Sequence, residues 1–101
     1  MLNQGEILQR IDSGKTRPIK KVIRVQYESR IQMPIDFWFL DQHHEILEII
    51  SNRKINRFNS EYLVRTDKGI YKLKFYYLAL NLPNMNMTFN GWWKLDFKVI
   101  E

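Results

Sequence analysis

The 101-residue chain contains no cysteine, only two histidines, three prolines and four glycines. Without cysteine it can form no disulfide, no thiolate metal site and no cysteine nucleophile. No segment approaches the roughly 20 apolar residues of a membrane-spanning helix, and the N-terminal residues lack the apolar run of a signal peptide. We therefore expect a cytoplasmic protein that does not enter a membrane.

Sequence motifs of catalysis are missing as well. There is no Gly-x-Ser-x-Gly elbow, no Walker loop and no Gly-x-Gly-x-x-Gly, and the carboxylates are scattered along the chain. The four glycines all lie at expected turns or helix ends. We therefore expect neither an enzyme nor a cofactor, and a small hydrolase or metal-dependent enzyme is the least favoured alternative.

The charge is moderately positive. Sixteen basic and eleven acidic residues give a net charge of +5 and a computed pI near 9.6. A basic chain favours an anionic partner such as nucleic acid. The acidic residues are interspersed and no basic block exists, so a solvated surface of mixed charge explains the same numbers equally well.

The N-terminal segment, residues 1–17, has the pattern of a short helix. Ile7, Leu8 and Ile11 share one face over residues 3–12, and Asn3 with Glu6 three positions later forms the pattern of a capping box. Ser13 and Gly14 end the pattern. This segment is expected to precede a separate β domain.

From Pro18 onward, apolar residues recur at the two-residue period of β-strands. The expected strands cover residues 18–30, 35–40, 45–50, 61–66, 70–77 and 92–100, with a polar loop at 51–60 and a loop at 79–91. Five or six short strands separated by turn signals predict an all-β domain at 18–101, a small antiparallel SH3-like barrel.

The order of these segments resembles that of a known family. Its features here are Pro34 with the aromatic strand Ile-Asp-Phe-Trp, the run 45–50, the run from Tyr62 to Gly69, Tyr71-Lys-Leu, and Trp92-Trp93. Over about residues 18–100 the chain resembles short bacterial β domains of unknown function, which are sometimes appended to DNA-polymerase-like repair proteins. The resemblance implies a small β domain in a nucleic-acid context, without catalytic residues.

Two features depart from that family. Its turn after the aromatic strand is rich in Arg and Gly, whereas this chain has Asp41-Gln-His-His, and the loop before Trp92 is long. A metal site needs three or four converging ligands, but neighbouring side chains on a strand point to opposite faces. His43 and His44 are thus weak metal candidates that only a reorienting turn with Asp41 or Glu45 would assemble. We expect a four-residue hairpin turn from Asp41 to His44.

The last three strands predict a basic, aromatic outer face. If the apolar residues of one parity, including Tyr62, Tyr71, Trp93, Phe97 and Val99, form the core, their neighbours point outward. The outward residues that suit single-stranded nucleic acid are Arg65, Lys72, Lys74, Tyr76, Trp92, Lys94 and Lys98. Cations would contact phosphates and flat rings would stack on bases. The alternative is an ordinary solvated sheet face.

A protein-interaction or structural accessory domain is the second functional hypothesis. Leu82, Met85, Met87 and Phe89 alternate with polar residues in the expected loop, and flexible methionines suit adaptable contacts. A homodimer would form through this loop or through the aromatic strands. The loop would otherwise fold back to close one end of the barrel.

Overall fold

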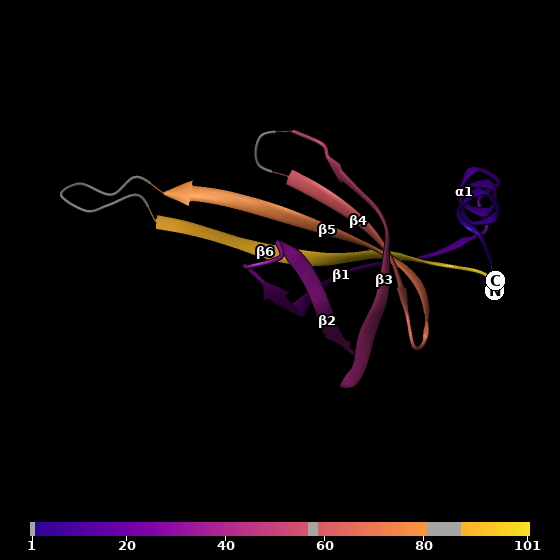
Figure 1. Ribbon diagram of the computed structural model, residues 1–101, viewed down its shortest axis with the longest axis horizontal. Helices are drawn as coiled ribbons and strands as arrows, with labels where there is room; N and C mark the ends of the chain where they lie inside the picture. Colours follow the sequence, from indigo (N-terminus) through magenta and orange to yellow (C-terminus); the bar gives the residue numbers. More distant parts are fainter. Residues whose placement is uncertain (1, 57–58, 81–87) are drawn as a thin grey trace.

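The computed structural model describes residues 2–56, 59–80 and 88–101 (Figure 1). This part of the chain forms one helix and six strands, which are α1 (Gln4–Asp12), β1 (Thr16–Glu28), β2 (Met33–Phe39), β3 (Gln42–Lys54), β4 (Asn59–Thr66), β5 (Gly69–Leu80) and β6 (Thr88–Val99). Within the described ranges, no helix has the length and apolar character needed to cross a membrane.

Each strand pairs antiparallel with the next, and β1 pairs with β6 to close the barrel. The expected small antiparallel barrel with a short N-terminal helix is therefore confirmed. Successive turns lie at opposite ends of the barrel. The helix and both termini lie at one end, whereas β5 and β6 project beyond the barrel at the other (Figure 1).

Helix α1 begins with the expected capping box. The Asn3 side chain accepts a hydrogen bond from the Glu6 backbone N–H, and the Glu6 carboxylate accepts one from the Asn3 N–H. These bonds satisfy two backbone donors that a helix N-terminus otherwise leaves unpaired. Ile7 is completely buried against the outer wall of the barrel, together with Leu63 and Ile70. The helix thus covers part of one sheet face.

The barrel interior contains the apolar residues that alternation assigned to the core of β4 and β5. Phe37, Val64, Leu73 and Leu95 are buried there at 0% exposure. The assignment of Phe97 and Val99 to this core is wrong, because both pack on the outer wall near α1.

A β-bulge explains that error. Lys72 pairs with Phe97, but the next residue, Leu73, pairs with Leu95. Asp96 is therefore an extra residue on β6, and such an extra residue reverses which side chains face inward beyond it.

The turn between β2 and β3 also differs from the expectation. Phe39 pairs with Gln42, so only Leu40 and Asp41 form the turn, with φ of 52° and 60°. Positive φ at both central residues defines the type I′ turn, whose twist matches that of a hairpin. The expected four-residue turn is therefore wrong, and His43 and His44 belong to β3.

The strands are longer than the sequence predicted. β3 continues to Lys54, into the expected polar loop, and β5 and β6 extend to Leu80 and from Thr88, into the expected loop at 79–91. Residues 81–87, which include Leu82, Met85 and Met87, lie outside the described residues, and so does the Phe89 side chain.

Candidate functional site

The barrel is hollow at the end away from α1. A cavity of about 520 Å³ opens there and is lined by five aromatic rings, which are Tyr27, Tyr62, Phe75, Tyr77 and Trp93. We call this cavity the mouth. The rings come from β1, β4, β5 and β6, so the closed sheet itself brings together residues that are far apart in the sequence.

Trp93 is the centre of this aromatic wall. Its ring centroid lies 4.9 Å from that of Phe75, 5.4 Å from that of Tyr62 and 6.1 Å from that of Tyr27, with tilted planes. Trp93 is 9% exposed and Tyr62 is 7% exposed. The rings therefore hold one another in place while their remaining surface faces the cavity.

Gly91 explains how the Phe75 ring fits. A Cβ atom at Gly91 would lie 2.5 Å from the Phe75 ring and 2.8 Å from the Tyr76 carbonyl oxygen, both closer than atoms can approach. The Phe75 ring thus occupies space that any other residue at position 91 would fill. A glycine at this position is required for the shape of the mouth.

Polar groups complete the lining of the mouth. Asn52 and Lys54 lie on β3, and Ser60 lies on β4. Asn56 lies between these two strands, and Gln32 lies directly before β2. Lys54 is the only charged residue among the described residues of the lining. Burial, followed by the neighbouring Tyr27 hydroxyl, raises the pKa of Tyr62, so this phenol stays neutral at physiological pH.

The lining therefore combines ring faces, amides and hydroxyls with a single positive charge. Large aromatic surface binds apolar or flat groups, and a few polar groups fix their orientation. The described lining residues include no histidine and no carboxylate to act as a general base.

The outer face of β5 and β6 holds five of the seven residues predicted to bind nucleic acid. Cross-strand pairing places Lys74 opposite Lys94 and Tyr76 opposite Trp92, with Lys72 on the same side. We call these five residues the basic face. Tyr76 and Trp92 stack with centroids 5.3 Å apart and planes 13° apart, and Trp92 is 46% exposed.

Arg65 does not belong to the basic face. It lies beside the N-terminal segment, where its guanidinium donates to the Leu2 carbonyl oxygen at 2.7 Å and lies 3.8 Å from Glu48. Its side chain is only 12% exposed. Arg65 pairs with Ile70 and points to the outer side of the sheet, as predicted, but the N-terminal segment covers it, so it is not exposed together with the lysines.

Lys98 is also separated from the basic face. The bulge at Asp96 places it opposite Tyr71, which is buried inside the barrel, and the Lys98 ammonium lies 5.5 Å from the Tyr71 ring centroid. The two residues therefore share the inner side of the sheet, at the end near α1. The expectation that Lys98 points outward beside Lys94 is wrong, because the bulge that turns Phe97 outward also turns Lys98 inward.

Carboxylates neutralise much of the remaining positive charge. Glu61 lies 3.0 Å from Lys72, 3.9 Å from Lys74 and 3.2 Å from Arg53, and Lys74 also approaches Asp96 at 3.6 Å. Burial alone would raise the pKa of Glu61, but these three cations lower it overall. Since the ionised carboxylate binds the cations, fewer of them are available for phosphate groups.

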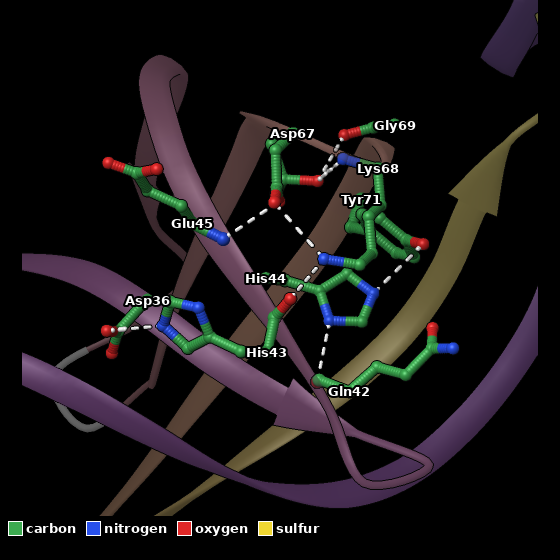
Figure 2. A network of polar contacts seen from close by, with 10 residues as sticks. Asp36, Gln42, His43, His44, Glu45, Asp67, Lys68, Gly69 and Tyr71 are labelled. Carbon is green, nitrogen blue, oxygen red and sulfur yellow. Dashed lines mark hydrogen bonds and ion pairs between the residues drawn. The ribbon is translucent and has the colours of Figure 1, made fainter.

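The two histidines point in opposite directions, as expected for neighbours on a strand (Figure 2). On the outer side, His43 lies 2.8 Å from the Asp36 carboxylate. On the inner side, His44 is 2% exposed and stacks on Phe37 with ring centroids 4.7 Å apart. No group of three metal-ligating side chains occurs in the part of the chain that the structure describes.

The inner histidine has a defined hydrogen-bonding role. Its Nδ1 lies 3.0 Å from the Gln42 carbonyl oxygen, which can only accept, so Nδ1 carries the proton. The Tyr71 hydroxyl then donates to Nε2 at 3.4 Å (Figure 2). Burial lowers the pKa of His44, and this favours the neutral ring.

Sequence reasoning assigned most of the rings of the mouth to the core and did not recognise the cavity. The available signal was the position of the rings, because Tyr27, Tyr62 and Tyr77 all lie near the strand ends that meet at one end of an antiparallel barrel. No family model, curated protein or solved structure matches the chain.

Proposed function

We propose that the protein is a non-enzymatic binding module and that its binding site is the mouth of the barrel. The observation that carries this proposal is the cavity of about 520 Å³ walled by five aromatic rings. Binding sites for small ligands are typically concave, measure roughly 300–1,000 Å³ and combine apolar walls with a few polar groups. The mouths of β-barrels are a common place for them.

The shape of the walls favours a ligand with a flat ring. Trp93, Tyr62 and Phe75 offer π faces at several tilts, and a planar group gains both buried area and stacking energy against them. The amide of Asn52 and the hydroxyl of Ser60 would orient such a ring by hydrogen bonds to its edge.

Titration with small neutral planar compounds tests this proposal. We would add quinoline, indole and adenine to the isotope-labelled protein and follow its backbone amide resonances by NMR. The expected result is saturable shifts at Asn52, Ser60 and Tyr62, with no comparable shifts at Lys94. If none of the compounds shifts the resonances of the mouth, the proposal is wrong.

Two neighbouring tryptophans provide matched variants. Trp93→Phe removes indole surface from the mouth, and we expect it to weaken binding of the planar compounds by about tenfold or more. Trp92→Phe changes only the outer face and should leave their affinity unchanged. Equal losses in the two variants would show that the compounds do not bind in the mouth.

A second candidate function is contact between the basic face and single-stranded nucleic acid. The observation that favours it is the stacked pair Tyr76 and Trp92, of which Trp92 is 46% exposed, beside Lys94. Among the described residues no carboxylate pairs with Lys94. An exposed ring next to a cation can stack a base while the cation contacts the phosphate.

Binding of labelled single-stranded DNA at increasing salt tests this second function. We expect weak binding that decreases as salt rises, because phosphate contacts release counterions. Trp92→Ala should reduce this binding further. Absence of binding even at low salt would exclude the basic face as a nucleic-acid site.

A further inference from the structure

We infer that the ligand of the mouth is a nucleobase that carries a phosphate, either a free mononucleotide or the unpaired end of a single strand. This inference rests on the proposed function and names its ligand. The base would lie among the aromatic rings, and the phosphate would lie at the rim beside Lys54.

The single charge in the lining indicates which charge the ligand carries. Lys54 is the last residue of β3, is exposed, and pairs across the strands with Ser60 at the edge of the mouth. A cationic ligand such as a quaternary ammonium also binds aromatic cages, but it would be repelled by this ammonium. The described lining offers no carboxylate to compensate, so a neutral or anionic ligand is favoured.

The polar groups distinguish a base from an acyl chain. Exposed Ile31 and Ile55 adjoin the lining residues Gln32 and Lys54, so the rim alone would also suit a fatty acid. An acyl chain, however, leaves amide groups without hydrogen-bonding partners when it displaces water from them. The carboxamide of Asn52 both donates and accepts, as the edges of nucleobases do.

The position of these groups matches the two parts of a nucleotide. Asn52 pairs with Tyr62, and Lys54 pairs with Ser60, two residues nearer the end of the barrel along each strand. The amide therefore lies beside the buried rings, whereas the ammonium lies farther out. A base bound by the rings and by Asn52 would place its phosphate on the side of Lys54.

Quenching of Trp93 fluorescence provides a direct measurement. The chain has three tryptophans, and in the double variant W38F/W92F Trp93 is the only one left. We would titrate this protein with adenosine monophosphate, adenosine, ribose 5-phosphate, a 5′-phosphorylated single-stranded oligonucleotide and the matching duplex. Thermal unfolding of the double variant would first verify that it folds.

The expected order of affinity follows from the two contacts. Adenosine monophosphate should quench Trp93 saturably and bind about fivefold or more tighter than adenosine, because the phosphate forms a charge-assisted contact with Lys54. Ribose 5-phosphate should bind far more weakly, since it has no planar base. If the physiological source is a strand end, the oligonucleotide will bind tighter than the mononucleotide; if it is a free nucleotide, it will bind more weakly. The duplex should not bind, because its bases are paired.

Lys54→Gln provides a test at an exposed position outside the hydrophobic core. In this variant adenosine monophosphate should bind no tighter than adenosine. Asn52→Ala should weaken adenosine and adenosine monophosphate by the same factor, about fivefold. Equal effects of Lys54→Gln on both compounds would contradict the assigned position of the phosphate.

Other outcomes would overturn the inference without affecting the proposed function. If quinoline and indole bind in the mouth but adenosine monophosphate binds no better than ribose 5-phosphate, the ligand is not a nucleotide. Tighter binding of laurate or of tetramethylammonium than of adenosine monophosphate would also refute it. A failure of every planar compound to bind would refute the proposed function as well.

Discussion

The two faces of the β5–β6 sheet differ in how completely their side chains are occupied by contacts with one another. Trp92 and Trp93 are neighbours on β6, yet Trp92 stacks on Tyr76 at the surface and Trp93 forms the wall of the mouth. On the outer face, Lys72 and Lys74 are already paired with Glu61. On the inner face, the rings leave a cavity that their own side chains do not fill.

This difference shows that composition alone is a poor guide to a binding surface. The outer face has more charge, but its carboxylates and cations offset one another. The inner face has little charge, but its aromatic surface faces a cavity that can hold a ligand. The comparison can be tested by disturbing one face while the other is left intact.

The largest expected effect comes from Trp93→Ala. Removing a buried tryptophan typically costs about 3–5 kcal/mol, because the contacts are lost and a void remains. Trp92→Ala should cost about 1 kcal/mol, since Trp92 is half-exposed and loses mainly its stacking on Tyr76. Urea unfolding followed by circular dichroism measures both, and equal losses would show that the two faces do not differ in packing.

Glu61→Gln disturbs the outer face in the opposite sense. Lys72, Lys74 and Arg53 lose the carboxylate that they surround, and we expect the free energy of unfolding to fall by about 2 kcal/mol. The ligand affinity of the mouth should not change. The basic face would gain one net positive charge, so any binding of single-stranded DNA to it should become stronger.

Glu48→Gln is the matched control for this charge effect. Glu48 is 57% exposed and lies 3.8 Å from Arg65, so its removal should cost about 0.5 kcal/mol or less. If Glu48→Gln and Glu61→Gln destabilise the protein equally, the cluster around Glu61 is no stronger than an ordinary surface pair. Chemical unfolding at neutral pH distinguishes these outcomes.

Much of the barrel could be predicted from alternation of apolar and polar residues. The inward positions of Tyr62, Val64, Tyr71 and Leu73 followed from the two-residue period, as did the opposite directions of His43 and His44. Alternation fails beyond a bulge, because one extra residue reverses the pattern without changing its period. Lys98 was misplaced for this reason.

The remaining errors have a different cause. Arg65 points outward as predicted, but its exposure was wrongly expected, because the sequence of a short amphipathic helix does not specify which sheet face it covers. The mouth was missed because a pattern of apolar residues does not distinguish a filled interior from a hollow one. That distinction depends on the shapes of side chains from five strands that meet only in the closed barrel.

Gly91→Ala tests the shape of the mouth with a smaller perturbation. The added methyl group would collide with the Phe75 ring and with the Tyr76 carbonyl oxygen. We expect a loss of about 1–3 kcal/mol and weaker binding of planar ligands, because Phe75 must move. Gly5→Ala in α1 is the control, since a Cβ atom there meets only the Asn3 side chain at an ordinary 3.4 Å. A Gly91→Ala variant as stable as wild type would contradict this close packing.

The smallest expected effect concerns the histidine on the inner side of β3. Burial is the main influence on His44 and lowers its pKa below the ordinary value of 6.5. The Gln42 carbonyl and Asp67 raise this pKa, and Lys68 and Lys98 lower it. As the pH falls to about 6.5, His44 is therefore protonated in the unfolded chain but remains neutral in the folded chain. Stability from this group is fully present above pH 6.5 and is lost as pH falls through the folded pKa, by at most about 1.4 kcal/mol per pH unit.

His44→Phe should remove this part of the pH dependence. Phenylalanine keeps the stacking on Phe37 but cannot be protonated, although it forgoes the hydrogen bonds to Gln42 and Tyr71. We expect the variant to lose less stability than the wild type between pH 6.5 and 5, as measured by urea unfolding at several pH values. Parallel curves for the two proteins would show that the buried ring takes up its proton as readily as an exposed one. The inner face would then be better hydrated at this end than its packing indicates.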